Sequence, residues 1–408
     1  MVSALRGVHS HDAARRGQPM THRRDHNSVP LGRRVAELRA HRGMSQQAFA
    51  DRLGKSKSWV DKVERGVRRL DRYSVIRDIA EVLRLDPTML LGPRQPPTPA
   101  PAENGIDAVR AALACYHHRP RPTVTAQQAG GQVAYAWMAY QHARYPQLLG
   151  VLPDLLDAAH GTRSLLVSAY RLTASVLVKL DHAELAWLAA DRAVSASADD
   201  PTRTASATIA VAQALRALGH HRIALTAALA AADPADDDTV RGSLYVQAGL
   251  AAADNGDRRN AHDLLDHAAA LADRQVSDTD PHHTGFGPAA VQTARSLAAH
   301  RLGDTAEAIL RHEHVIRSGA WSRLPPEHRA AHLIDAARAY LDASRHSRAG
   351  QALLAADRIA PAEVRNRPVA RTLLAEVIRG GPAAADVARL ATVVGLTDPS
   401  GPPTGGIW

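Results

Sequence analysis

The chain has 408 residues, a formal net charge of +9, and a composition of 45% hydrophobic and 22% charged residues. This length exceeds one ordinary hydrophobic core, so at least two domains are expected. Only 4% of the residues are aromatic and alanine is abundant, which favours helices packed through small side chains over β-sheets. A single cysteine, Cys115, excludes an internal disulfide framework and a four-thiolate zinc site.

The positive charge is concentrated in the N-terminal quarter. Residues 1–95 contain 20 Lys and Arg against 10 Asp and Glu, whereas residues 96–408 contain 30 against 31. An arginine bias of the genome would spread the excess evenly along the chain. The asymmetry indicates that the N-terminal part binds a polyanion and that the remainder does not.

The chain begins with residues 1–30, which are polar and lack a sustained apolar period, and which predict a disordered leader. A basic arm that contacts a nucleic acid is the alternative. Apolar spacing, serine N-caps and glycine stops then predict four short helices. These helices are expected at residues 31–41, 46–53, 57–65 and 73–85.

A proline-rich stretch follows, with five prolines between Gly92 and Asn104, and predicts a semi-rigid linker. It separates a small N-terminal domain from a long Ala-rich part. The expected organisation is a leader at 1–30, a small helical domain at 31–92, a linker at 93–105, a repeat domain at 106–395 and a flexible tail at 396–408.

The Ala-rich part reads as helix pairs joined by short turns. Turns placed at Asp181, Gly219, Gly256, Gly303 and Ser344 are 38, 37, 47 and 41 residues apart. Five residues after each turn stands an alanine: Ala186, Ala224, Ala261, Ala308 and Ala349. Seven residues before each turn the residue is Ala, Gly or Ser. Small residues at these places let the two helices of a hairpin approach closely.

This register resembles the tetratricopeptide repeat (TPR) and implies an α-solenoid of degenerate TPR-like helix hairpins. A generic Ala-rich helical domain is the alternative. Ala349 is expected to lie where two helices meet, so that a leucine there would overpack the contact. Ala330 lies off the register and is expected to tolerate a leucine.

Residues 31–92 resemble the XRE family of helix-turn-helix domains, which includes lambdoid phage repressors. The matching residues are Leu38-Arg39, Arg42-Gly43, Ser45-Gln46, Ala50, Gly54, Ser56, Val60, Val63 to Gly66, Ile79-Ala80 and Leu83. The resemblance implies an all-α fold with a lambda-repressor-like domain at its N-terminus. In this domain the second helix of the motif projects its exposed N-terminal side chains toward base edges.

The resemblance also implies which side chains contact DNA. The predicted DNA-binding residues are Gln46, Lys55, Lys57, Ser58, Asp61, Lys62, Arg65, Arg68 and Arg69. Three of the chain's four lysines belong to this set, and lysine can donate to guanine O6 and N7. The arginines are better placed for phosphates. A solvated surface charge is the alternative for each lysine.

Three of the residues in this region are ambiguous. Gln46 sits where it can brace against a phosphate or a base. Asp61 would repel a phosphate unless it accepts a hydrogen bond from a cytosine amine. Trp59 either covers the helix interface or touches a thymine methyl, and we favour packing.

An XRE domain followed by helical repeats resembles the RRNPP regulators, which bind peptide pheromones, and a group of actinobacterial regulators often found beside biosynthetic genes. The runs at residues 324–329 and 362–368 are similar to the actinobacterial group. The architecture implies a homodimer on an operator in double-stranded DNA, with a peptide, a small molecule or a partner protein sensed on the concave face of the repeats. Residues predicted to face that side are Arg171, Gln213, Arg216, Gln247, His300 and Arg338. A protein-interaction scaffold tethered to DNA, without ligand sensing, is the alternative.

The sequence offers little for catalysis. It contains no Gly-rich phosphate loop, no nucleophile elbow and no carboxylates clustered for acid-base chemistry. Its histidine pairs, such as His220-His221, would point about 100° apart on a helix and rarely share a metal. We therefore expect neither an enzyme nor a metal or cofactor. No signal peptide and no apolar run of about 20 residues is found, which predicts a cytoplasmic protein that is nucleoid-associated when bound to DNA.

Overall fold

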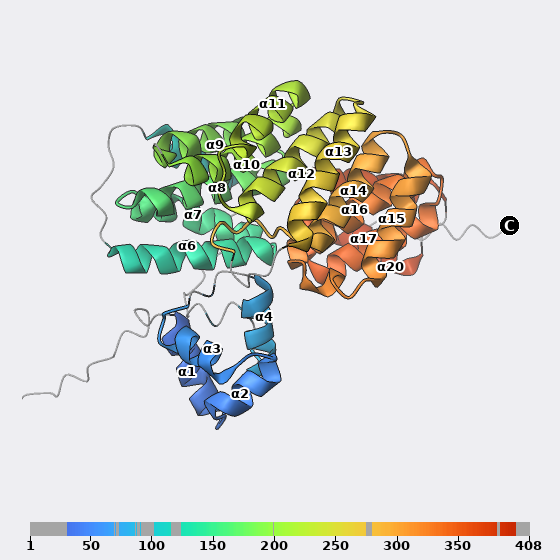
Figure 1. Ribbon diagram of the computed structural model, residues 1–408. Coiled ribbons are helices and arrows are strands. Elements are labelled where there is room, and N and C mark those ends of the chain that lie inside the picture. Colours follow the sequence, from blue (N-terminus) through green and yellow to red (C-terminus); the bar gives the residue numbers. More distant parts are fainter. Residues whose placement is uncertain are drawn as a thin grey trace, which may run out of the picture.

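The computed structural model describes residues 31–68, 70, 73–85, 87, 90, 102–115, 124–198, 200–274, 280–381 and 384–396. These residues are mostly helical, and none of them lies in a β-strand. Figure 1 shows a small group of helices below a larger array. The predicted leader at 1–30 and the predicted tail from residue 397 lie outside the described residues, as does the predicted linker up to residue 101.

Four helices form the N-terminal domain: α1 (Leu31–His41), α2 (Gln46–Leu53), α3 (Lys57–Glu64) and α4 (Tyr73–Val82). The side chains of Ser45 and Ser56 each accept a hydrogen bond from the backbone three residues ahead, both at 3.1 Å, and so cap α2 and α3. Gly54 has a φ of 63° and ends α2 in the left-handed conformation that glycine adopts readily. The predicted caps and turn are confirmed.

Close approach of α1 and α3 makes this domain compact. A methyl group on Gly32 would lie 1.9 Å from the carbonyl oxygen of Val63, so only glycine fits at this crossing. Phe49, Val60 and Ile79, from three helices, are buried in one core. This packing fixes α3 rigidly against the rest of the domain.

The larger array consists of paired antiparallel helices followed by shorter C-terminal elements. They are α5 (Ala102–Ala114), α6 (Ala126–Gln141), α7 (Tyr145–Ala159), α8 (Arg163–Lys179), α9 (Ala183–Ser197), α10 (Pro201–Ala217), α11 (His221–Ala232), α12 (Asp238–Asp254), α13 (Arg258–Asp273), α14 (Pro288–Arg301), α15 (Thr305–Arg317), the 3-10 helix η3 (Trp321–Arg323), α16 (Pro326–Asp342), α17 (His346–Ile359), α18 (Pro361–Arg365), α19 (Pro368–Arg379) and α20 (Ala385–Val393). Helix α5 begins directly after Pro101, four residues inside the predicted linker, because proline is tolerated next to the first turn of a helix.

The five predicted turns share one backbone geometry. Their φ values are positive: 67° at Asp181, 79° at Gly219, 77° at Gly256, 84° at Gly303 and 57° at Ser344. In each turn, the amide that follows donates to the carbonyl five residues earlier, as His182 does to Leu177 at 2.9 Å. A residue in this left-handed conformation ends the first helix of the hairpin, and the second helix begins directly after it. The five alanines of the register are all buried.

A sixth hairpin, α6–α7, has the same turn but lacks the alanine. Ala143 has a φ of 54°, and the amide of Arg144 donates to the carbonyl of Ala139. The register position five residues later is Leu148, which is fully buried. The repeat register, which requires an alanine five residues after each turn, therefore did not identify this hairpin. The fold is a solenoid of degenerate TPR-like hairpins behind a helix-turn-helix domain.

The two ends of the array meet. Lys179 on α8 lies 2.8 Å from the carboxylate of Glu327 on α16 and 3.0 Å from that of Glu363 on α18. Tyr145 and Arg367 also donate to Glu363. Although burial alone would raise it, the charges of Lys179 and Arg367 lower the pKa of Glu363 to about 2. One hydrophobic core likewise joins helices from both ends.

No helix in the described part of the chain is long and apolar enough to cross a membrane.

The expectation that Ala330 tolerates a leucine loses its basis, because Ala330 is fully buried in the core shared by the two ends of the array. The repeat register did not predict this burial, because it marks only the positions where the two helices of one hairpin meet.

A matched pair of substitutions on α13 tests the hairpin register. Ala261 is buried against α12, where a methyl group on Gly249 would lie 2.9 Å from Cγ of Leu265, whereas Ala270 on the same helix is exposed. Ala261→Leu should overpack the contact and lower the free energy of unfolding by about 1–3 kcal/mol. Ala270→Leu should change it by less than about 0.5 kcal/mol. Urea denaturation followed by circular dichroism measures both, and equal effects would contradict the register.

Candidate nucleic-acid interface and concave face

Helix α3 has a solvent face that carries predicted reading residues. Lys57, Ser58 and Lys62 are exposed, whereas Val60 and Val63 point into the domain core. The exposed residues come from the first two turns of a helix whose N-terminus favours a phosphate. Rigid packing behind α3 means that these side chains are presented from a fixed helix.

A cluster of charged and aromatic side chains flanks this face. Trp59 is buried in the domain core, which supports packing as its role. Lys55 Nζ and Arg68 Cζ each lie 5.9 Å from the centroid of a Trp59 ring, within the range of a cation–π contact. Asp61 forms a 3.1 Å ion pair with Arg65, which offsets the repulsion that its carboxylate would exert on a phosphate.

Gln46 belongs to a network inside the domain. Its amide donates to Glu64 at 2.8 Å, and Glu64 also receives two hydrogen bonds from Arg39, at 2.6 and 3.1 Å. This bidentate pair ties α1 to α3. The sequence singled out all three residues as matches to the family pattern but did not show that they hold one another. The predicted residue Arg69 lies outside the described residues.

The N-terminal domain contacts the repeats directly. Met138 of α6 is buried in the same hydrophobic cluster as the helices of the N-terminal domain. Arg77 of α4 donates to the backbone carbonyl of Ser322 in η3. The sequence contained no signal for either contact, because each joins residues from separate domains.

A buried histidine pair supports the segment that carries η3. A ring nitrogen of His312 lies 3.0 Å from one of His332, and the ring of Trp321 packs edge-on against His332. Burial lowers the pKa of His312 to about 4 and that of His332 to about 3. Both rings are therefore neutral near pH 7, and one donates its N–H to the other.

The six residues predicted to bind a ligand all lie on the first helices of hairpins. Two of them, Arg171 and Gln213, line one small cavity of about 50 Å³ together with Trp137. The sequence analysis assigned no role to Trp137. In this cavity two predicted ligand residues from different hairpins, on α8 and α10, lie together.

The remaining four of these residues have other surroundings. Arg216 donates to Gln247 at 3.1 Å and to Asp254 at 2.9 Å, so two predicted ligand residues bind each other. His300 lies 2.6 Å from the carboxylate of Asp342. Arg338 is half-buried on α16. These contacts form a polar seam along the first helices.

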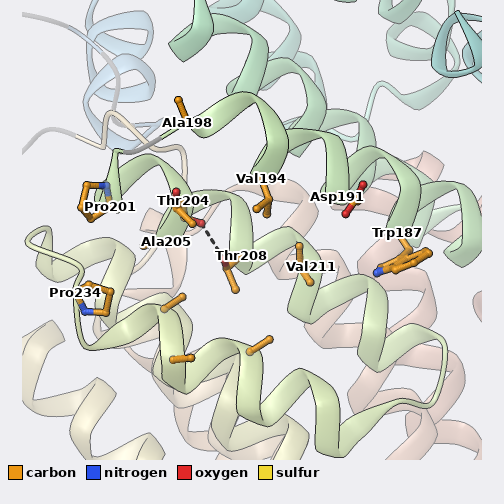
Figure 2. A pocket seen from close by; sticks show the side chains of 13 residues that line it. Trp187, Asp191, Val194, Ala198, Pro201, Thr204, Ala205, Thr208, Val211 and Pro234 are labelled. Atoms are coloured by element: carbon orange, nitrogen blue, oxygen red, sulfur yellow. Dashed lines mark hydrogen bonds between the residues drawn. The ribbon is translucent and has the colours of Figure 1, made fainter. Parts of the chain in front are cut away.

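A larger groove of about 680 Å³ lies elsewhere, between α9 and α11. Figure 2 shows Trp187 at one end of this groove and Pro201 and Pro234 at the other. Its lining is mostly apolar, and none of the six predicted ligand residues lines it. In the described part of the chain, no group of three or more His, Cys, Asp or Glu is placed to hold a metal ion.

Comparison with known proteins gives a family match at the N-terminus of the chain. A helix-turn-helix domain model matches residues 30–91. A relative from Bacillus subtilis (strain 168), the uncharacterized HTH-type transcriptional regulator YazB, is 38% identical over 64 residues, which cover 16% of this chain and 91% of the relative. The range matched by the helix-turn-helix model contains α3.

Among solved structures, a crystal structure of Bacillus thuringiensis PlcR in complex with the peptide PapR7 and DNA aligns with the chain. The alignment covers 60% of this chain and 94% of the PlcR chain, at 16% identity and a TM-score of 0.32.

The histidine pair predicts a pH dependence of stability. Because the native pKa values of His312 and His332 lie below the unfolded value of about 6.5, the unfolded state binds more protons between pH 6.5 and 4. The stability contributed above pH 6.5 should therefore be lost as the pH falls, on the order of 1–2 kcal/mol per histidine between pH 7 and 5. Urea unfolding at both pH values, compared with the His312→Leu/His332→Leu variant, measures this contribution. An identical pH slope in both proteins would contradict it.

Proposed function

The chain belongs to the XRE-like helix-turn-helix transcriptional regulators, and we propose that α3 reads an operator while the concave face of the repeats senses an effector. The observation that carries the proposal is the solvent face of α3, with Lys57, Ser58 and Lys62 exposed on a helix fixed from behind. Its family makes the protein a DNA-binding regulator. The residue roles and the effector are our proposals.

DNA recognition divides between base reading and phosphate contacts. We assign base reading in the major groove to Lys57, Ser58 and Lys62, and phosphate contacts to Arg65 and Arg68. Support comes from the exposure of the first set and from the excess of 10 positive charges in residues 1–95. Asp61 stays paired with Arg65 unless a cytosine amine replaces the arginine. Gln46 acts through Glu64 by positioning α3.

Effector sensing would reach the DNA through the contacts between the domains. The segment that carries η3 joins α15 to α16 and receives a hydrogen bond from α4, and α6 supplies Met138 to the core of the reading domain. A change in curvature of the repeats would therefore move α3. An effector can cause such a change only by binding one curvature more tightly than the other.

The protein should act as a dimer, because one domain of about 60 residues buries little DNA surface. Two copies of α3, spaced by about 34 Å, would match two half-sites one helical turn apart. The repeats are the larger part of the chain and contact the reading domain directly. We therefore assign dimerisation to the repeats.

Substitutions on and beside α3 separate reading from positioning. Against an operator selected from random duplexes, Lys57→Ala should cost roughly 1–3 kcal/mol of binding and relax the preference at one base pair. Arg68→Ala should weaken binding to all sequences alike and reduce the slope of log affinity against log salt by about 1. Arg222→Ala, exposed on α11, is the control and should bind as the wild type does. Uniform losses in both test variants would disprove the assignment, and a wild-type salt slope near zero would disprove DNA binding by this domain.

Sedimentation velocity of the full chain with the selected operator measures the stoichiometry. We expect two chains per duplex and half-sites whose centres lie about 34 Å apart. Insertion of five base pairs between the half-sites turns one of them to the opposite side of the helix, so it should lower affinity at least tenfold. A single chain per duplex at full affinity would instead favour a monomer tethered to DNA as a scaffold.

A further inference from the structure

A described loop of the repeats lies against helices that are distant in sequence. Residues 280–287 precede α14 within the longest repeat spacing, the 47 residues from Gly256 to Gly303. Three of the residues they contact are Trp137 on α6, Arg171 on α8 and His328 near the start of α16. The loop therefore runs from the fourth hairpin of the predicted register to α6, α8 and α16, and Figure 1 shows it beside α6. It places the chain's own atoms on the face where an effector is expected.

Contacts at both ends hold the loop in one conformation. The carboxylate of Asp280 accepts hydrogen bonds from the amides of Thr284, at 2.9 Å, and Gly285, at 2.8 Å. At the other end, Phe286 fills the space next to α12, where a methyl group on Gly242 would lie 2.1 Å from the phenyl ring. Between them, His283 has a φ of 49°, a left-handed conformation that costs free energy in a residue other than glycine. Strain of this kind persists only where surrounding contacts impose it.

Two contacts of this loop have the form of ligand contacts. The carbonyl oxygen of His282 accepts a hydrogen bond from Arg171 Nη1 at 2.7 Å. The ring of His283 stacks on Trp137, with the centroids 5.0 Å apart and the planes 18° from parallel. The carbonyl oxygen of His282 thus binds the arginine, and the flat ring of the adjacent His283 covers the tryptophan.

Arg171 has more capacity than this loop uses. The residue is 4% exposed, and its Nε is buried without a hydrogen-bond partner among the described residues. Burial lowers the pKa of Arg171 to about 10, only partly opposed by Asp280. A neutral carbonyl is a weaker acceptor for a buried guanidinium than a carboxylate, which can accept two hydrogen bonds at once. A ligand carboxylate would therefore bind Arg171 more strongly than the carbonyl of His282 does.

The adjoining cavity supplies room and further polar groups. Its volume is about 50 Å³, and Gln141, Ser175 and Gln213 line it beside Arg171. Glu327 also lines it and would repel an anion, but Lys179 lies 2.8 Å from that carboxylate and offsets its charge. The space admits a small group without any movement, and displacement of His283 would open the face of Trp137.

We propose that Arg171 and Trp137 form a binding site for a ligand with a carboxylate next to a flat ring, and that residues 282–283 occupy this site in its absence. The inference rests on the proposed effector-sensing function and names the chemistry that the site recognises. A peptide that ends in an aromatic residue and a small aromatic acid both have this chemistry. Binding exchanges the carbonyl of His282 for the carboxylate and the ring of His283 for that of the ligand.

Fluorine NMR on the full-length protein tests the site with three probes. They are Gly-Gly-(4-fluoro)Phe with a free carboxylate, the same peptide as its C-terminal amide, and 4-fluorophenylacetate. Line broadening on titration gives each affinity. We expect at least one free acid to bind and the amide to bind about tenfold more weakly or not at all. The peptide acid binding alone identifies a peptide terminus as the ligand class, and fluorophenylacetate binding as well shows that a small acid suffices.

Two variants assign the binding to this site. Arg171→Met should weaken the acid at least about tenfold. His283→Gly removes the competing ring, relieves the positive φ and leaves Arg171 intact, so it should raise the affinity at least threefold. His262→Ala, exposed on α13, is the control and should leave the affinity unchanged. If Arg171→Met fails to fold by circular dichroism, the His283→Gly gain and the contrast between acid and amide decide.

Certain outcomes overturn the site. No acid binding to the wild type and His283→Gly, equal affinity for acid and amide, or unchanged affinity in a folded Arg171→Met would each do so. Operator binding is measured on the same proteins without probe. If the wild type binds the operator but no probe, the proposed ligand site is wrong and the DNA-binding function stands. If the wild type does not bind the operator at all, the proposed function itself is wrong.

Discussion

The close approach of the two helices in each hairpin is the constraint on which the array depends. Left-handed turns at five equivalent positions reverse the chain within a few residues, so the second helix starts in contact with the first. Buried alanines at the register then leave no side chain to hold the two backbones apart. Protein interiors are close-packed, so adding even one methylene group to such a contact strains the packing. Hairpin geometry therefore follows from turn conformation and side-chain volume together.

Polar contacts determine how the hairpins assemble into a closed array. Lys179, Glu327 and Glu363 bring α8, α16 and α18 together, and Tyr145 adds α7. Desolvation of such a cluster offsets much of its Coulomb energy, so its net contribution to stability is smaller than the number of charge contacts implies. A different curvature of the repeats would separate these partners and leave a buried charge unpaired, which is unfavourable. The ends of the solenoid thus meet in one arrangement, and this arrangement creates the face that Arg171 and Trp137 share with the loop at 280–287.

The reading domain combines internal rigidity with contacts to the repeats. Arg39, Gln46 and Glu64 connect three of its helices, and Gly32 lets α1 and α3 touch. The domain therefore moves as one body. Met138 and the hydrogen bond from Arg77 to Ser322 connect that body to α6 and η3. Among the described residues, these contacts offer a path by which an effector on the repeats could act on the reading domain.

Local chemistry alone determined much of this protein. Serine caps, glycine stops and apolar spacing predicted the four N-terminal helices, and the family pattern in them identified a helix-turn-helix domain. Asp181, Gly219, Gly256, Gly303 and Ser344 were found as turns because each signal lies within one hairpin. Tertiary structure alone decided what depends on residues distant in sequence. Ala330 is buried in a core that helices from both ends of the array share, Gln46 donates to Glu64, and Leu148 takes the place of an alanine in a hairpin that the register missed. The closure at Lys179 and the contact of the 280–287 loop with Trp137 and Arg171 belong to this second group. They join residues more than a hundred positions apart, and no periodicity in a single sequence records which distant helices will meet.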